Sequence, residues 1–189
     1  MQEPRSQLTV FTVGHSNRNL DDFVGLLRAY GIERLVDVRT IPRSRHNPQF
    51  NSDTLAKFLR NRRIGYRHVK ELGGLRHARA DSPNTGWHNA SFRGFADYMQ
   101  TPEFAAAVAK LVELATGKVT TIMCAEAVPW RCHRSLIGDA LIVRGVEVMD
   151  IFSPKSSKPH VLTAMAVVRG TLITYPPMVA GPQLDEEAP

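Results

Sequence analysis

The chain has 189 residues, a formal net charge of +6 and 43% hydrophobic residues. A chain of this length and composition buries a core without disulfides or metal, so we expect one globular domain rather than a disordered, collagenous or repeat protein. No apolar run is long enough to span a bilayer, and the first ten residues lack the pattern of an export signal. Two cysteines form no disulfide framework, so we expect a cytoplasmic protein with reduced thiols and no membrane contact.

The positive charge is concentrated in one part of the chain. Residues 39–80 contain nine Arg and two Lys against one Asp and one Glu, a local net charge of +9. A one-sided segment of this kind attracts polyanions by neutralising phosphates and releasing counterions. It predicts a nucleic acid or an anionic small molecule as partner, and a basic surface that only aids solubility is the alternative.

Short apolar strands alternate with amphipathic helices in the first part of the chain. The β-rich run Leu8–Val13 stops at Gly14, and an amphipathic helix follows from an Asn19 cap to Gly31. The next expected elements are a strand at Arg34–Val38, a helix from a Ser52 cap through Leu59, and a strand at Ile64–Val69.

Residues 75–90 are rich in Gly, Pro, Asn, Ser, His and Arg and are expected to form a long loop, which in a compact domain is more often functional than neutral. A helix follows from a Thr101 cap, with Pro102 at its first position, to Gly117. The later expected elements are a strand at Val119–Met123, a helix at 131–144 and a strand at Val146–Phe152. A short helix and an added strand are expected within Val161–Tyr175. We therefore expect a single domain at 1–175, followed by a flexible tail at 176–189.

This alternation predicts an α/β domain with a mostly parallel sheet of about five strands and helices on both faces, because parallel neighbours need crossover connections. We expect an open sheet, and a partial or distorted barrel fits the same pattern. In open parallel sheets, ligands bind beyond the carboxyl ends of the strands. The candidate polar residues at these ends are His15 and Ser16 after the first strand, Asp37, Arg39, Arg43 and Ser44 after the second, and Glu126 after the fourth.

The segment after the fourth strand is the most informative. It places Cys132 in the expected first turn of a helix between Arg131 and Arg134, where backbone N–H groups and positive charge favour a thiolate. The same amides and arginines form a natural anion pocket. Cys124, at the end of an apolar strand, is expected to be a small apolar filler.

Several side chains are candidates for proton transfer. Glu126 serves as a general acid or base if burial raises its pKa, and His133 or His15 does so near neutral pH without help. Asp37 and Arg39 also fit a purely structural ion pair at the end of a strand.

Three more specific types of site match the spacing of the Cys, His and Arg residues poorly. A phosphatase or rhodanese loop needs four or five residues between the cysteine and a closing arginine, whereas six separate Cys124 from Arg131 and one separates Cys132 from Arg134. A redox dithiol would pair Cys124 with Cys132, whose spacing is not C-x-x-C. A metal site could recruit these cysteines with His133 or His15, but no zinc-ligand spacing is present. We therefore expect no metal and no cofactor.

Four motifs of the chain resemble the DUF488 family: T-V-G-H-S, then D-V-R followed by Pro and S-x-x-x-P-x-F, then L-G-G, and finally M-C-A-E-x-x-P-x-x-C-H-R. The resemblance covers roughly residues 9–153, without departure from the pattern. The family name carries no established reaction, so the resemblance implies kinship rather than chemistry. Carried over by position, it implies a functional set of His15, Ser16, Asp37, Arg39, Ser44, Glu126, Cys132, His133 and Arg134.

The leading hypothesis is an enzyme that acts on an anionic, nucleotide-like or nucleic-acid-like substrate at the carboxyl ends of the strands. Its catalytic residues would be Cys132 as the reactive thiol and Glu126, His133 or His15 for proton transfer. Its substrate-binding residues would be Ser16, Asp37, Arg39, Arg43, Ser44 and Arg134. The alternatives are a non-catalytic module that binds nucleic acid or a phosphate ligand, and a metal-assisted hydrolase.

Overall fold

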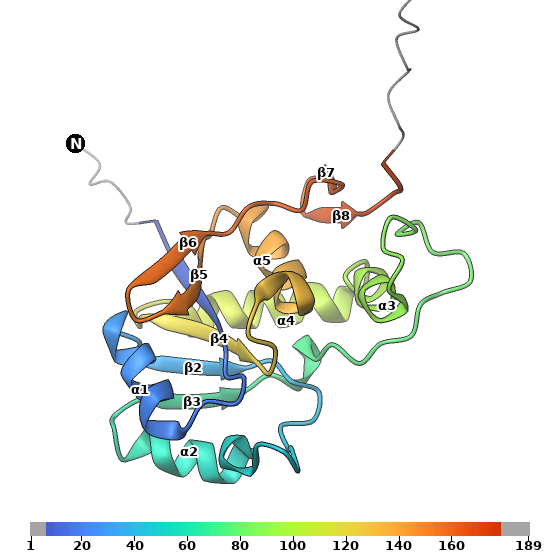
Figure 1. Cartoon of the computed structure of the whole chain (residues 1–189). Coiled ribbons are helices and arrows are strands. Elements are labelled where there is room, and N and C mark those ends of the chain that lie inside the picture. Colours follow the sequence, from blue (N-terminus) through green and yellow to red (C-terminus); the bar gives the residue numbers. More distant parts are fainter. Residues whose placement is uncertain (1–6, 179–189) are drawn as a thin grey trace, which may run out of the picture.

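The computed structural model describes residues 7–178, which fold around one six-stranded sheet (Figure 1). The strand order is β3-β2-β4-β1-β5-β6; the first five are parallel, and β6 is antiparallel to β5. The predicted α/β class is confirmed, and the barrel alternative is wrong because β3 and β6 do not pair to close the sheet. The strands are β1 (Thr9–Gly14), β2 (Arg34–Asp37), β3 (Gly65–His68), β4 (Thr120–Cys124), β5 (Glu147–Ser153) and β6 (Ser156–Pro159).

Helices cover both faces of the sheet. Asn19 caps the first helix by accepting a hydrogen bond from the Asp22 amide at 2.8 Å, and Thr101 caps the fourth through the Phe104 amide at 3.2 Å. One face carries α1 (Leu20–Ala29) and α2 (Ser52–Arg60), and the other carries α3 (Ala90–Tyr98), α4 (Pro102–Ala115) and α5 (Arg134–Ile142). Three 3-10 turns complete this part of the chain: η1 (Pro48–Phe50), η2 (Lys70–Leu72) and η3 (Pro129–Arg131).

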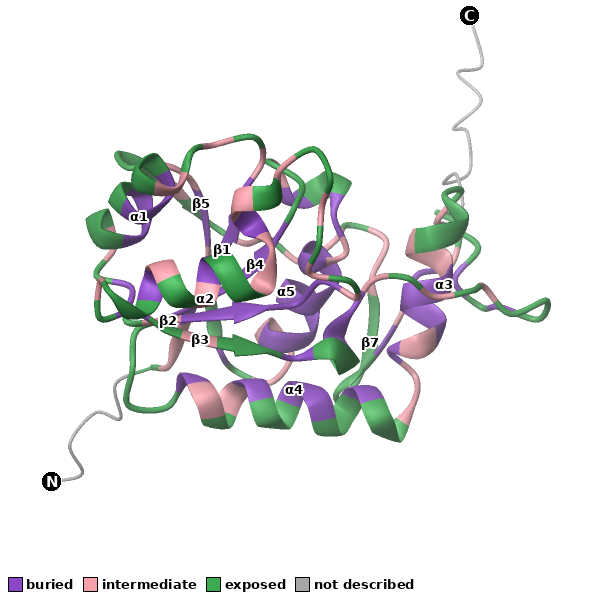
Figure 2. Ribbon diagram, turned by 90° about the horizontal axis from the view of Figure 1, so that it is seen from below, coloured by how far each residue is buried: buried purple, intermediate pink, exposed green. Residues whose placement is uncertain are grey.

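The core lies on both sides of the central strand β4, all of whose residues are buried. Ile122 and Cys124 pack in the cluster under α3, α4 and α5, whereas Met123 packs in the cluster under α1 and α2. This alternation is the period-two pattern of a strand covered on both faces. Figure 2 shows buried central strands beside the exposed edge strand β3. The carboxyl end of β4 therefore delivers Cys124 to the middle of the molecule.

The sequence pattern does not predict α3. A glycine in its middle, Gly94, argues against a helix by propensity. In the structure a Cβ at Gly94 would lie 2.6 Å from the Arg76 carbonyl oxygen, so the missing side chain lets the preceding segment pack directly on the helix. Residues 75–89 contain no helix or strand, in agreement with the expected long loop.

The predicted helix at 131–144 is shorter than expected. The 3-10 turn η3 ends at Arg131, Cys132 has an extended backbone with φ −139° and ψ 140°, and α5 begins at Arg134 with His133 as its N-cap. Cys132 therefore precedes the helix, and its expected place in the first helical turn is wrong. The prediction failed because Pro129 starts a separate turn, which the apolar periodicity of α5 does not reveal.

The structure also corrects the secondary structure expected for the C-terminal part of the chain. The short helix expected within Val161–Tyr175 is absent, and a hairpin of β7 (Val167–Arg169) and β8 (Leu172–Thr174) turns at Gly170, whose φ is +61°. From residue 179 onward, the expected tail at 176–189 lies outside the described residues. Between residues 7 and 178, no helix is long and apolar enough to cross a membrane.

Candidate functional site

A pocket of about 490 Å³ opens at the carboxyl ends of β1, β2 and β4. The loops after these three strands form most of its walls, and Gly74, Leu75 and two residues of α3, Ser91 and Phe92, complete them. Open parallel sheets bind ligands at this position. It brings together seven of the ten candidate residues, and it adds Cys124 and Arg131 from the same segment. The seven are His15, Arg39, Arg43, Ser44, Glu126, Cys132 and His133.

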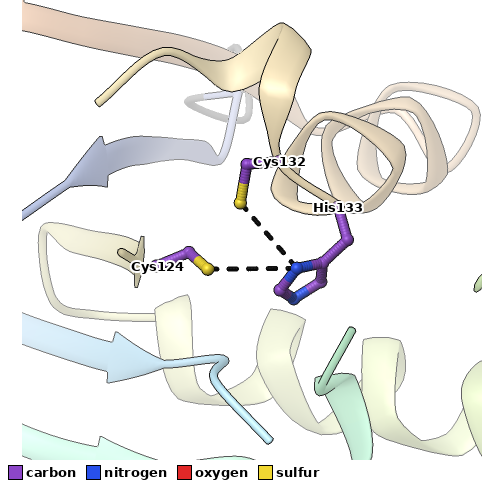
Figure 3. A group of neighbouring side chains, drawn as sticks. All are labelled: Cys124, Cys132 and His133. Atoms are coloured by element: carbon purple, nitrogen blue, oxygen red, sulfur yellow. Dashed lines mark hydrogen bonds between the residues drawn. The ribbon is translucent and has the colours of Figure 1, made fainter. Parts of the chain in front are cut away.

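Two cysteines and a histidine meet in the wall of this pocket (Figure 3). The Nδ1 atom of His133 lies 3.9 Å from the Cys124 sulfur and 3.8 Å from the Cys132 sulfur, and the three atoms lie within 4.8 Å of one another. The other ring nitrogen, Nε2, lies 3.0 Å from the Val38 carbonyl oxygen. A carbonyl oxygen only accepts, so Nε2 carries the hydrogen and Nδ1 presents a lone pair to both sulfurs.

The two thiols differ in their acidity. The hydrogen bond from the Cys132 thiol holds the pKa of Cys124 below its usual range, and the Ala125 amide and the charge of Arg134 act in the same direction against burial. The same hydrogen bond, together with burial, raises the pKa of Cys132. Cys124 is therefore the more acidic thiol, whereas the sequence pattern favoured Cys132.

A buried ion pair supports another part of the pocket wall, to which Arg39 belongs. The Arg39 guanidinium donates to Asp37 through Nε at 2.9 Å and through Nη2 at 2.6 Å, and Nη2 also donates to the Phe50 carbonyl oxygen at 2.8 Å. Tyr66 donates to the same carboxylate at 2.7 Å. Asp37 is fully buried and does not line the pocket, so it acts as the support that holds Arg39 in place.

His15 contacts both parts of the site: its side chain lies beside Arg39, and its amide donates to the Cys124 carbonyl oxygen at 3.0 Å. Its ring stacks on Phe50 with 4.1 Å between the ring centroids, and its Nδ1 donates to the Ser16 carbonyl oxygen at 2.7 Å. Burial lowers the pKa of His15 to about 4, and the charge of Arg39 acts in the same direction. His15 is therefore neutral at physiological pH, with its Nε2 lone pair 3.4 Å from Arg39 Nη1.

Exposed charged groups surround the pocket mouth. Arg43 and Arg131 are exposed, and Arg43 lies 3.9 Å from Asp53, a surface pair that is weak in water. Glu126 is exposed as well, so the buried acid expected at this position is not observed. Ser44 accepts a hydrogen bond from the Asn47 amide at 3.0 Å and so shapes the wall between β2 and η1.

Two more candidates lie outside the pocket lining. Arg134 is fully buried and donates to the carbonyl oxygens of Glu126 and Ala127, so it holds the loop after β4 in place. Ser16 has a left-handed backbone with φ +52°, and its amide donates to the Ala125 carbonyl oxygen at 2.9 Å. Both residues fix the chain around the site, and neither lines the pocket.

A comparison with known protein families shows to which family the chain belongs. The family described as "Domain of unknown function DUF488" matches residues 19–141. The chain belongs to the DUF488 family. No curated protein and no solved structure matches this DUF488 chain. The chemistry of the site therefore has to be inferred from its own residues.

Proposed function

We propose that this DUF488 protein is an enzyme that binds an anionic substrate in the 490 Å³ pocket and uses Cys124, Cys132 and His133 as its reactive centre. The observation that carries the proposal is the lone pair of His133 Nδ1, which faces both sulfurs in the wall of a pocket bordered by arginines. Sulfur and imidazole in contact form a nucleophile with its base, or a set of metal ligands. A filler cysteine in an apolar core needs neither a polar partner nor an opening to solvent.

The arginines make the pocket suited to an anion. Asp37 neutralises Arg39, so the cations available to a ligand are chiefly Arg43 and Arg131 at the mouth. Guanidinium groups bind carboxylates and phosphates through paired hydrogen bonds. A phosphate or carboxylate held there would place the rest of the substrate against the Cys–His group.

The surrounding surface favours a nucleotide-like or nucleic-acid-like substrate. The local charge of +9 is reduced because Arg39, Arg62 and Arg79 pair with carboxylates outside the segment. Other basic residues form no ion pair within residues 7–178. They lie along α2, β3 and the flanking turns, and the first of them belongs to the loop that forms a pocket wall. These residues are Arg45, Lys57, Arg60, Arg63, Arg67 and Lys70.

Two alkylating reagents of different charge test the proposal. Iodoacetate is an anion and iodoacetamide is neutral, so the ratio of their rates at Cys124 measures the attraction of anions to the reactive centre. We expect this ratio in the folded, chelator-treated protein to be about tenfold higher than in urea, the effect of roughly 1.4 kcal/mol of electrostatic attraction. Peptide mass spectrometry assigns the modified cysteine.

Matched arginine variants sharpen the test. Arg131→Ala removes a pocket cation and should lower the ratio, whereas Arg45→Ala removes an exposed arginine that does not line the pocket and should leave it unchanged. A ratio equal to that in urea, or an equal effect of both variants, would contradict an anion site at the Cys–His group.

A further inference from the structure

We propose that Cys124, Cys132 and His133 bind one thiophilic divalent metal ion of the zinc class, with a fourth coordination position open to the pocket. This inference deepens the proposed function, because the ion would then be the group that meets the anionic substrate. The metal-site inference depends on the proposed function only for the identity of the fourth ligand. The ligand set itself stands on the geometry of the three side chains.

The distances fit a tetrahedral ion. With Zn–S near 2.3 Å and Zn–N near 2.0–2.1 Å, two ligands at the tetrahedral angle lie about 3.6 Å apart for a sulfur and a nitrogen, and about 3.8 Å apart for two sulfurs. The observed S–N distances are 3.9 and 3.8 Å, and all three atoms lie within 4.8 Å of one another. The S–N distances exceed the tetrahedral spacing only slightly, so small shifts of the three side chains would bring the atoms to coordination distance.

The backbone explains how two adjacent residues share one ion. Neighbouring side chains diverge in a regular helix and point to opposite faces in a strand. Cys132 is extended and His133 has helical angles, φ −56° and ψ −15°, so the chain changes conformation between them. This break turns both side chains toward the end of β4, where Cys124 lies (Figure 3). Sequence spacing alone hides the site for this reason.

The surroundings of His133 are those of a metal ligand. Metal-bound histidines commonly donate their other ring N–H to a carbonyl or a carboxylate, which fixes the tautomer. His133 Nε2 does so with Val38 at 3.0 Å, and the Phe95 ring packs edge-on at 5.0 Å between centroids. A Cβ at Gly74 would lie 2.5 Å from Nδ1, so a side chain at this position would crowd the metal-binding nitrogen.

Charge and ligand type select the ion. Two thiolates neutralise a divalent cation, which suits cysteines that are only 8% and 3% exposed. Sulfur and imidazole ligands without a carboxylate favour zinc-class ions over magnesium or calcium. Three protein ligands with one open position are the arrangement of catalytic rather than structural zinc sites. The open position faces the pocket because all three ligands line it.

Cobalt(II) provides the direct test, because it replaces zinc and reports its ligands by absorption. The full chain is made metal-free under reducing conditions and titrated with Co²⁺. We expect saturation at one ion per chain, with thiolate-to-cobalt charge-transfer bands in the near ultraviolet and strong visible bands of a four-coordinate ion. Added Zn²⁺ should displace the cobalt and abolish the spectrum.

Variants identify the ligands. Cys132→Ser and His133→Gln should weaken cobalt binding on the order of 100-fold or more, beyond the usual loss for a group that only supports a ligand. His77→Gln changes an exposed histidine that does not line the pocket and should bind as the wild type does. Circular dichroism checks that each variant is folded, and the charge-transfer bands of the wild type report sulfur ligation without any variant.

Absence of charge-transfer bands at saturating Co²⁺, or unchanged affinity in folded Cys132→Ser, would overturn the metal site. The alkylation ratio separates this failure from a failure of the proposed function. A raised iodoacetate ratio without cobalt binding leaves the anion site standing and removes the ion. Cobalt binding with an alkylation ratio equal to that in urea keeps the ion and removes the anionic substrate.

Discussion

The stability of the fold should fall as pH rises from neutral to alkaline, because of one buried histidine. The His160 imidazole lies between two carboxylates, with Nδ1 2.8 Å from Asp150 and Nε2 3.2 Å from Asp139. Burial lowers the pKa of His160, but the hydrogen bonds to Asp139 and Asp150 outweigh it and raise the pKa to about 9. The side chain is 6% exposed, so solvent screens these contacts little.

Other groups around the imidazole donate hydrogen bonds to its two carboxylate partners. Tyr175 donates to Asp139 at 2.9 Å, and Thr12 donates to the buried Asp150. The Thr163 amide donates to Asp139 at 3.1 Å. These hydrogen bonds hold the two carboxylates in position beside the imidazole.

The size and direction of the effect follow from the two pKa values of His160. A rise from 6.5 in the unfolded chain to about 9 in the folded protein corresponds to about 3 kcal/mol. Below pH 6.5 both states are protonated and this stabilisation is complete. As pH rises above 6.5 the unfolded state loses its proton first, and the stabilisation is lost by the time pH passes the folded value near 9.

Urea unfolding followed by tryptophan fluorescence between pH 6 and pH 10 measures this loss under reducing conditions. The free energy of unfolding should decrease by about 3 kcal/mol across this range. His160→Gln should be less stable than the wild type at pH 6 and should show a much flatter pH dependence. Equal slopes for the two proteins would refute the assignment of the effect to His160.

Three further predictions concern the loop after β4 and the basic surface. Gly14→Ala should prevent folding or lower the midpoint of urea unfolding sharply, because a Cβ there would lie 1.7 Å from the Glu126 carbonyl oxygen. Arg134→Met should cost about 2–4 kcal/mol in the same assay, because the Glu126 and Ala127 carbonyl oxygens lose their donors. A single-stranded oligonucleotide column should retain the protein at low salt, and Arg60→Glu with Arg63→Glu should lower the salt needed for elution.

Each of these predictions has a clear contrary result. Wild-type stability of Gly14→Ala would mean that the loop after β4 moves freely away from β1. Wild-type stability of Arg134→Met would mean that water replaces the guanidinium. Failure of the column to retain the protein at low salt would remove nucleic acid as the partner of the basic surface.

The fold was predictable because its signals are local. Apolar periodicity, the Asn19 and Thr101 caps and strand–helix alternation together indicate a parallel sheet covered on both faces. The missed helix α3 contains Gly94, whose role depends on a distant segment that packs against it. The missed β6 is a short, largely exposed edge strand, Ser156–Pro159, which carries no apolar alternation.

The site was predictable only in part. The strand ends indicate where polar groups gather, since parallel strands deliver them to one edge of the sheet. The contact between Cys124 and His133 depends on the conformational break before α5, and the buried place of Arg134 depends on the path of the loop after β4. Neither follows from spacing along the chain. Spacing therefore indicates the buried position of Cys124 but not its contact with His133, and it does not indicate that Arg134 is buried.

The central claim is that an anion occupies the same pocket as the Cys–His group. Its most direct test is the rate of Cys124 alkylation by neutral iodoacetamide in chelator-treated protein, with and without pyrophosphate or a mononucleotide at constant ionic strength. We predict saturable protection by the anion in the wild type and in Arg45→Ala, and much weaker protection in Arg131→Ala. Alkylation at the same rate with and without saturating anion would contradict the claim.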